Sequence, residues 1–245
     1  MNKVVQALWV GTRLPPMQRL SICSFLDHGH DFHLYAYDDI SDVPSGTTLC
    51  DAAAIFPREK VFQHKQGFGK GSYSTFSNLF RYKLILDRGG WWVDTDLVCL
   101  RRFDLDADFV FATENEGGAA LTATCAFKCP RGAPMLQYCL EIGESKNPDD
   151  LKWSEIGPYL FDEAVNRFGL TAHKVAPPLF NPINTWEFDD VLKPDFDVTR
   201  LSGSYGLHLW NQIWRHEQRD PDTTAHPESL YARLKRQYGV DGNQS

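Results

Sequence analysis

Asp94 and Asp96, two aspartates separated by a single residue, are the pair in this sequence best suited to chemistry. Apolar stretches at 91–93 and 97–100 flank them on both sides. An ionised carboxylate is costly to bury without a partner, and a divalent cation is a common partner for one. Oxygen ligands of this kind suit magnesium, manganese or calcium. The pair therefore predicts a metal site built from carboxylates.

Spacing alone does not single out this pair, because aspartates separated by a single residue occur elsewhere in the chain. We interpret the other pairs as solvated turns: Asp104 and Asp106, Asp106 and Asp108, Asp195 and Asp197, and Asp220 and Asp222. What distinguishes Asp94 and Asp96 is the context before them. A helix, two glycines and a hydrophobic strand are predicted to lead directly into these carboxylates.

The stretch from 72 to 100 positions the two aspartates. Ser72 and Ser74 are candidate N-caps of a helix. Apolar residues then recur at helical spacing without a breaker, at Phe76, Leu79, Phe80 and Leu84. Gly89-Gly90 ends the helix, because glycine takes the left-handed conformation that a C-terminal cap needs. A short buried strand that carries both aspartates is predicted to follow.

The beginning of the chain predicts the sheet that holds this stretch. A buried strand at 4–10, a helix from the two prolines at 15 and 16 to about residue 28, and a strand at 31–37 form a βαβ unit. Such a unit implies a parallel sheet with a right-handed crossover. Ligands bind beyond the carboxyl ends of parallel strands, which places residues 9–11 at the functional edge. A plain core position for Trp9 is the alternative.

The second half of the chain is predicted to mix strands and helices. Strands are expected at 108–113, 120–128 and 170–176, helices at 132–143, 153–168 and 226–239, and an apolar strand that ends in His208. Gly157-Pro158 is predicted to break the helical segment at 153–168. The remaining histidines, His28, His30 and His33 among them, are expected to be exposed. The glycine-rich segment 63–73 lacks the Walker pattern and is interpreted as a mobile loop near the site.

Composition limits the class of protein. The net charge of −7 argues against a nucleic-acid partner, which would normally meet a basic patch. The six cysteines include no Cys-x-x-Cys pair and are interpreted as reduced, buried thiols. No segment approaches the ~20 apolar residues of a membrane span, and the amino terminus does not predict a signal peptide. We therefore expect a soluble, cytoplasmic protein, and read the basic final helix as a solvated face, with peripheral contact at the inner face of the membrane as the alternative.

The segment 77–100 resembles the sugar-binding region of the DxD-containing glycosyltransferases. That family includes fungal initiating mannosyltransferases, bacterial capsule and lipopolysaccharide transferases and, more distantly, the glucosylating domain of large clostridial toxins. The residues in register with the family pattern are Ser77, Arg81, Ile85, Gly89, Gly90, Asp94 and Asp96. The chain departs from the pattern at Asn78, where the family usually has aspartate, and at Trp92, where it usually has tyrosine.

The resemblance implies an α/β fold of the GT-A-like kind, a Rossmann-type mixed central sheet flanked by helices. A single domain over 1–245 is expected, with a nucleotide-binding part over about 1–110 and an acceptor-side part over about 111–245. The resemblance also implies a donor-binding set. It consists of Trp9, Val10 and Gly11 around the base and of Ser77, Asn78 and Arg81 near the sugar.

The metal site is completed, by the same resemblance, from the far end of the chain. His208 would join Asp96 in binding Mn²⁺ or Mg²⁺, Asp94 would bind the same metal or the ribose, and the indole N–H of Trp210 would reach a donor phosphate. Glu114 is a candidate for a carboxylate near the anomeric carbon or the acceptor, with an ordinary turn residue as the alternative.

The function expected from this resemblance is a metal-dependent retaining glycosyltransferase. It would move a hexose from a nucleotide sugar, with a UDP-sugar favoured, to a glycan or lipid-linked saccharide acceptor, as in bacterial surface polysaccharide synthesis. Two other classes stay open. One is a haloacid-dehalogenase-like phosphatase, because residues 93–98 also fit its D-x-D-x-[TV] pattern. The other is a non-catalytic sugar-nucleotide-binding module, for which Asn78 is the hint.

Overall fold

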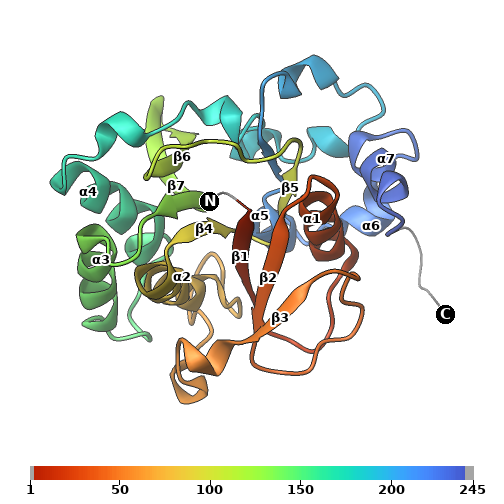
Figure 1. The fold of residues 1–245 in the computed structure, drawn as a ribbon. Coiled ribbons are helices and arrows are strands. Elements are labelled where there is room, and N and C mark those ends of the chain that lie inside the picture. The colour runs from red at the N-terminus through yellow and green to blue at the C-terminus, as the bar shows by residue number, and fades with distance from the viewer. Residues whose placement is uncertain (1–2, 241–245) are drawn as a thin grey trace.

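The computed structural model describes residues 3–240, and a six-stranded mixed sheet lies at its centre (Figure 1). The strands follow the order β3-β2-β1-β4-β7-β6 across the sheet. Their bounds are β1 Val4–Trp9, β2 Asp31–Ala36, β3 Thr48–Asp51, β4 Gly90–Val93, β6 Val110–Glu116 and β7 Ala119–Cys129. The pairs β1/β2, β2/β3 and β1/β4 are parallel, whereas β4/β7 and β6/β7 are antiparallel. The predicted α/β class with a mixed sheet in a single domain is confirmed.

Helices cover both faces of the sheet because the strands are apolar on both sides. The helix α1, Pro16–Asp27, crosses between β1 and β2 and packs on one face against Val5, Ala7 and Trp91. The helices α2 (Ser74–Arg88), α3 (Pro134–Glu144) and α4 (Leu160–Arg167) cover the other face, where Leu8 and Trp92 point. Neighbouring residues of one strand thus enter different cores, as the alternation of side chains along a strand requires.

A second, two-stranded sheet lies beside the main one. It pairs β5 (Leu97–Cys99) with β8 (Gly206–His208) in antiparallel register, Leu97 opposite His208. The helix α1 fixes this sheet, because the Ser21 hydroxyl donates to the Leu97 carbonyl at 2.6 Å and the Ser24 hydroxyl accepts from the Cys99 N–H at 2.8 Å. The short helices α5 (Asn211–His216), α6 (Pro221–Thr224) and α7 (Leu230–Gln237) follow β8.

Most local predictions agree with the structure, since α1, α2, β1, β2, β6 and β7 lie within a few residues of their expected bounds. Gly89 has φ 69° and ends α2 as expected. The non-helical φ and ψ of Gly157 likewise interrupt the segment before α4. All six cysteines are free thiols. Within residues 3–240, every helix is too short or too polar to cross a lipid bilayer.

Other local predictions are wrong. The residue before α2 is Tyr73, and neither predicted serine caps that helix with its side chain. No strand forms at 170–176, where a 3₁₀ turn at Thr171–His173 leaves only a single bridge between Lys174 and Phe111. The final helix is shorter than expected because it begins only at Leu230.

The expectation of exposed histidines is wrong for His30 and His64, which are both buried. The His30 ring accepts from the Phe103 N–H through Nε2 at 3.0 Å, and its Nδ1 lies 3.1 Å from the Lys3 carbonyl. These two contacts make His30 a structural residue that joins the start of β2 to the segment after β5.

Candidate functional site

Asp94 and Asp96 lie in a tight turn between two strands of different sheets, not within one strand as expected. The main-sheet strand β4 ends at Val93, and the Leu97 N–H that begins β5 donates to the Asp94 carbonyl at 3.1 Å. The turn therefore stands at the carboxyl end of a central strand, where ligands of α/β sheets bind. Because the chain leaves the sheet here, both carboxylates face the cavity instead of the hydrophobic core.

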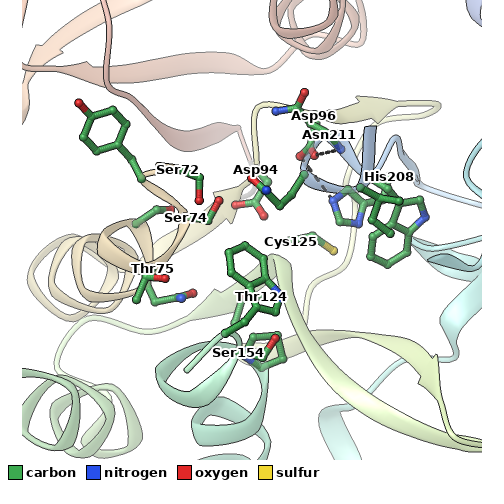
Figure 2. Close-up of a pocket in the computed structure, with 18 of the residues that line it drawn as sticks. Ser72, Ser74, Thr75, Asp94, Asp96, Thr124, Cys125, Ser154, His208 and Asn211 are labelled. Carbon is green, nitrogen blue, oxygen red and sulfur yellow. Dashed lines mark hydrogen bonds and ion pairs between the residues drawn. The ribbon is translucent and has the colours of Figure 1, made fainter. Parts of the chain in front are cut away.

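The pairing of β5 with β8 brings His208 to these aspartates. The Leu209 N–H donates to the Asp96 carbonyl at 2.9 Å, so that the register of the two strands continues past their ends. One ligand atom each from Asp94, Asp96 and His208 then lie within 4.8 Å of one another (Figure 2). Two carboxylate oxygens and an imidazole nitrogen suit a hard or borderline divalent cation. This donor set fits Mn²⁺ or Mg²⁺.

The orientation of His208 is fixed by Asn181. The Asn181 amide N–H donates to the Thr113 carbonyl at 2.9 Å, which turns its oxygen toward His208 Nδ1 at 3.0 Å. Nδ1 must therefore carry a proton, and Nε2 faces Asp96 Oδ1 at 3.4 Å. In the neutral ring Nε2 holds a lone pair, so the two atoms attract only when a cation or a proton lies between them.

The ionisation of this pair follows from that geometry. Burial by itself lowers the pKa of His208, but the facing Asp96 carboxylate outweighs burial and raises the pKa well above its usual range. Burial conversely raises the pKa of Asp96, yet the imidazole together with the Asn211 N–H at 2.9 Å lowers it overall. The carboxylate thus favours a positive charge on the imidazole side of this contact, and a divalent cation would supply such a charge.

Asp94 is held by two buried donors on its Oδ1 atom. The Trp92 indole N–H donates to this oxygen at 2.8 Å, and Arg81 Nη2 lies 3.1 Å from it. Burial still raises the pKa of Asp94, against the lowering by Arg81, and the charge of Asp96 raises it further. The negative charges of the two carboxylates repel each other, and a divalent cation between them would favour the ionised form of both.

Arg81 serves this carboxylate rather than standing free in the cavity. Its side chain is buried, donates to the Thr124 carbonyl at 2.9 Å and the Ser77 hydroxyl at 2.7 Å, and stacks 4.9 Å from the Trp92 ring centre. With a further bond from Nε to the Ser77 carbonyl, four of the five guanidinium N–H groups face protein partners. The expectation that it faces the donor hydroxyls does not agree with this arrangement.

A cavity of about 530 Å³ opens over the cluster, and the predicted site residues line it with the exception of Gly11. Gly11 instead lies against Trp9, where an added Cβ would stand 3.3 Å from the indole nitrogen. Trp9 donates its own N–H to the Arg13 carbonyl at 3.0 Å. The predicted residues that this cavity brings together are Trp9, Val10, Ser77, Asn78, Arg81, Asp94, Asp96, Glu114, His208 and Trp210.

Trp210 does not offer its indole N–H to the cavity. The residue has a left-handed backbone, with φ 55°, and its N–H donates to the Ile183 carbonyl at 3.0 Å. The centres of the Trp210 and His208 rings lie 4.1 Å apart, so Trp210 packs against the imidazole and supports it. This bond to Ile183 differs from the expected contact, in which the indole N–H would reach a donor phosphate.

Glu114 lies near the end of β6 and lines the cavity, and its carboxylate makes no hydrogen bond or ion pair with any of residues 3–240. Burial raises the pKa of Glu114 to about 7, with smaller increases from Glu116 and Asp94 against the opposing effect of His208. Half of these side chains would be ionised near neutral pH. Such a carboxyl can change charge when a ligand or cation arrives.

Several residues of the site were missed by the sequence analysis: Ser72, Asn211 and Tyr159 line the cavity, and Asn181 lies behind His208. Ser72 has a buried hydroxyl without a hydrogen-bond partner among residues 3–240, and this hydroxyl faces the cavity (Figure 2). Asn181 and Asn211 hold the cluster in place, although they carry no spacing signal of their own. Tyr159 is half exposed at the cavity and donates to Glu116 at 2.6 Å.

The glycine-rich loop forms one wall of the cavity because Trp153 fits against its backbone. Phe68 packs on Trp153 with ring centres 4.9 Å apart and on His216 of α5 at 4.5 Å. A Cβ at Gly69 would stand 2.1 Å from the Trp153 ring. Glycine is therefore required at this position by its surroundings as well as by its φ of 80°.

Replacing Gly69 with alanine should displace Trp153 and destabilise the fold. We expect the free energy of unfolding to fall by about 2 kcal/mol, from overpacking and backbone strain together. Gly71→Ala is the matched control, since Gly71 also has φ 80° but has no atoms within 4 Å of an added Cβ. Thermal unfolding of both variants measures the difference. Equal melting temperatures would show that Trp153 does not fill this space.

Replacing Asn181 with leucine should weaken metal binding, because the Nδ1 proton of His208 loses its acceptor. Residues that orient a ligating histidine typically contribute 10–100-fold to metal affinity, and we expect a loss of about this size for Mn²⁺. Titration calorimetry below the unfolding temperature gives the affinity directly. Asn166→Leu, on the exposed side of α4, is the control. An Asn181→Leu variant within twofold of the unchanged protein would contradict this account of the tautomer.

Comparison with known proteins agrees with the architecture. No protein-family model matches the chain, and no curated protein matches it. Among solved structures, the chain is similar to PaToxG glycosyltransferase, with 16% identity, a TM-score of 0.51, and 70% of this chain and 72% of that one covered. Apo glycosyltransferase GlyE of Streptococcus pneumoniae TIGR4 shows 12% identity and a TM-score of 0.48, over 97% of this chain and 64% of GlyE. The similarity to PaToxG shows a fold of the kind that a glycosyltransferase uses.

Proposed function

We propose that this protein is a metal-dependent retaining glycosyltransferase. It moves a hexose from a nucleotide sugar, with a UDP-sugar favoured, to a glycan or lipid-linked saccharide acceptor. The observation that carries the proposal is the cluster of Asp94, Asp96 and His208, whose ligand atoms lie within 4.8 Å at the floor of a large cavity. A glycosyltransferase-like fold with this cluster beyond a central strand supports the same reaction class.

The role of the cluster is to hold Mn²⁺ or Mg²⁺ where the leaving group departs. A bound cation of this kind acts as a Lewis acid toward the diphosphate that leaves the sugar. The protein keeps the three ligands ready: Asn181 orients His208, the Asn211 N–H fixes Asp96, and Arg81 holds Asp94. Ligands locked in this way need little rearrangement on binding.

The donor binds in the cavity, whose volume lies within the range of small-molecule sites. Trp9 and Val10 line the side toward β1, where the base is expected, and Ser77 and Asn78 line the part next to Asp94. The unpartnered hydroxyl of Ser72 supports a polar ligand, since a buried hydroxyl without a partner loses free energy.

Glu114 is proposed to act near the anomeric carbon. The departing diphosphate leaves positive charge on the sugar ring, as in glycoside hydrolysis, and an ionised carboxylate nearby stabilises it. The acceptor hydroxyl would attack on the face that the diphosphate leaves, which retains the anomeric configuration without an enzymatic nucleophile.

The broader setting is proposed on the resemblance alone. The nucleotide-binding part would comprise about 1–110 and the acceptor-side part about 111–245, in a cytoplasmic enzyme of bacterial surface polysaccharide synthesis. At most, the basic residues of α7 would give peripheral contact with the inner face of the membrane.

A transfer and hydrolysis assay with Mn²⁺ tests the proposal. UDP- and GDP-sugars are supplied one at a time, and a phosphomonoester serves as the parallel substrate. Release of nucleoside diphosphate that depends on Mn²⁺ supports the glycosyltransferase. Phosphate release from the monoester instead would indicate a phosphatase, and tight binding without turnover would indicate a binding module.

A further inference from the structure

The cavity meets its ligand with an excess of negative charge. Its lining carries the carboxylates of Asp94, Asp96, Glu114 and Glu116, but the fully cationic side chains of the lining are only Arg81 and Arg215 among residues 3–240. A nucleotide sugar brings further negative charge on its diphosphate. One divalent cation offsets only part of this repulsion, so a cationic side chain that faces the diphosphate would favour binding.

Arg81 is not available for that purpose. Its Nε donates to the Ser77 carbonyl at 3.2 Å, Nη1 donates to the Thr124 carbonyl at 2.9 Å, and Nη2 is shared between Ser77 and Asp94. Breaking any of these bonds would leave a buried group unpaired and would release Asp94. Trp210 is equally committed, because its N–H donates to Ile183.

Arg215 is the cation of the lining that remains free. It is exposed, and no hydrogen bond, ion pair or ring contact joins its side chain to any of residues 3–240. It lies on α5 four residues after Asn211, so both project from the same face of the helix. Asn211 is bound to Asp96 through its backbone N–H, which places the start of α5 beside the metal cluster.

The location of Arg215 also suits a ligand that extends from the cluster toward Trp9. A smaller adjoining cavity of about 350 Å³ shares Trp9, Asn211 and Arg215 with the main one. Arg215 thus stands at the rim common to both cavities. A diphosphate there would lie between the base expected at Trp9 and the metal cluster.

We propose that Arg215 binds the diphosphate of the donor and makes the site selective for nucleoside diphosphates over nucleosides. This inference rests on the proposed function. An arginine fork bonds two phosphate oxygens at once, which gives strength and geometry that a single donor lacks. Because the side chain is unpaired before the ligand arrives, binding breaks no existing protein contact.

Calorimetric titration with UDP, GDP, uridine and guanosine in the presence of Mn²⁺ tests this inference. For whichever diphosphate binds, Arg215→Ala should weaken its affinity about 10–100-fold, as expected for a lost charged hydrogen bond, and leave the matching nucleoside unchanged. Arg215→Lys should lose less, since it keeps the charge but not the fork. Arg219→Ala is the matched control, because Arg219 lines only the smaller cavity and pairs with Asp189 at 2.9 Å.

The outcomes separate the inference from the function on which it rests. Equal diphosphate affinity in the unchanged protein and in Arg215→Ala overturns the inference alone. An equal loss for diphosphate and nucleoside also overturns it, since a general distortion of the site would act on both. If neither diphosphate binds the unchanged protein with Mn²⁺, the proposed function and the inference fail together.

Discussion

Asp96→Asn should lose nearly all transferase activity while the protein stays folded. The amide oxygen can still accept from the Asn211 N–H, which now donates to Asp96 at 2.9 Å, so the turn keeps its main anchor. The negative charge that faces His208 is gone, however. Lewis-acid stabilisation of a leaving group is worth several kcal/mol, and we expect kcat to fall by at least about 10³-fold.

The same substitution should weaken Mn²⁺ binding, which separates a lost ligand from a damaged active site. Asp195→Asn is the control, because Asp195 is exposed and forms, with Asp197, another pair of aspartates separated by a single residue. It should retain both activity and metal affinity. Nucleoside diphosphate release gives kcat, and calorimetry gives the Mn²⁺ affinity. An Asp96→Asn protein with unchanged metal affinity and a kcat within tenfold would refute the assignment.

Glu114→Gln should change both the rate and the pH dependence of the enzyme. Only the ionised carboxylate stabilises positive charge on the sugar, and the pKa of Glu114 is about 7. The activity of the unchanged protein should therefore rise with pH through about neutrality. Electrostatic groups of this kind contribute about 10²–10³-fold, so the variant should lose about that factor in kcat above neutral pH and show no such rise.

The free energy of unfolding should fall as pH rises, whereas the activity should increase. A carboxyl whose pKa rises on folding stabilises the folded state below its usual pKa of 4.5, and that stability is lost as pH rises through about 7. In the absence of metal, the unchanged protein should therefore lose up to about 3 kcal/mol relative to Glu114→Gln between acidic and mildly basic pH. Denaturant unfolding across that range measures it.

Glu228→Gln, at an exposed position near α7, is the control for this experiment. It should run parallel to the unchanged protein at every pH. Added Mn²⁺ should shrink the effect of Glu114→Gln, because a nearby cation favours the ionised carboxylate. A constant stability difference across the pH range would show that Glu114 ionises normally and would remove it from the mechanism.

The parts of this protein that local patterns could predict are the helix α2, its glycine stop, the strand β1 that ends at Trp9 and the strand β4 that ends just before Asp94. Each depends on periodicity or on a breaker within a few residues. The capping serines fail because Ser72 is buried toward the cavity, so the chain enters the helix through Tyr73 instead. A cap preference amounts to only about 1 kcal/mol, and tertiary packing overrides it here.

The parts that local patterns could not predict depend on contacts between distant segments. The family resemblance suggested that His208 joins the aspartates, but nothing in the sequence predicted the pairing of β5 with β8 that brings it there. Asn181 lies in an irregular segment without periodicity, yet it determines the His208 tautomer. The bonds of Arg81 and Trp210 to protein groups are equally non-local, and they reassign both residues from ligand contacts to support of the cluster.

The central claim is that Asp94, Asp96 and His208 jointly bind the divalent cation that the reaction needs. The most direct measurement is anomalous diffraction from crystals grown with Mn²⁺ and a nucleoside diphosphate. We expect one strong manganese peak between the carboxylates of Asp94 and Asp96 and the His208 ring, next to the bound nucleotide. A peak elsewhere in the cavity, or a His208 ring still paired with Asp96 beside a nucleotide bound without the ion, would contradict it.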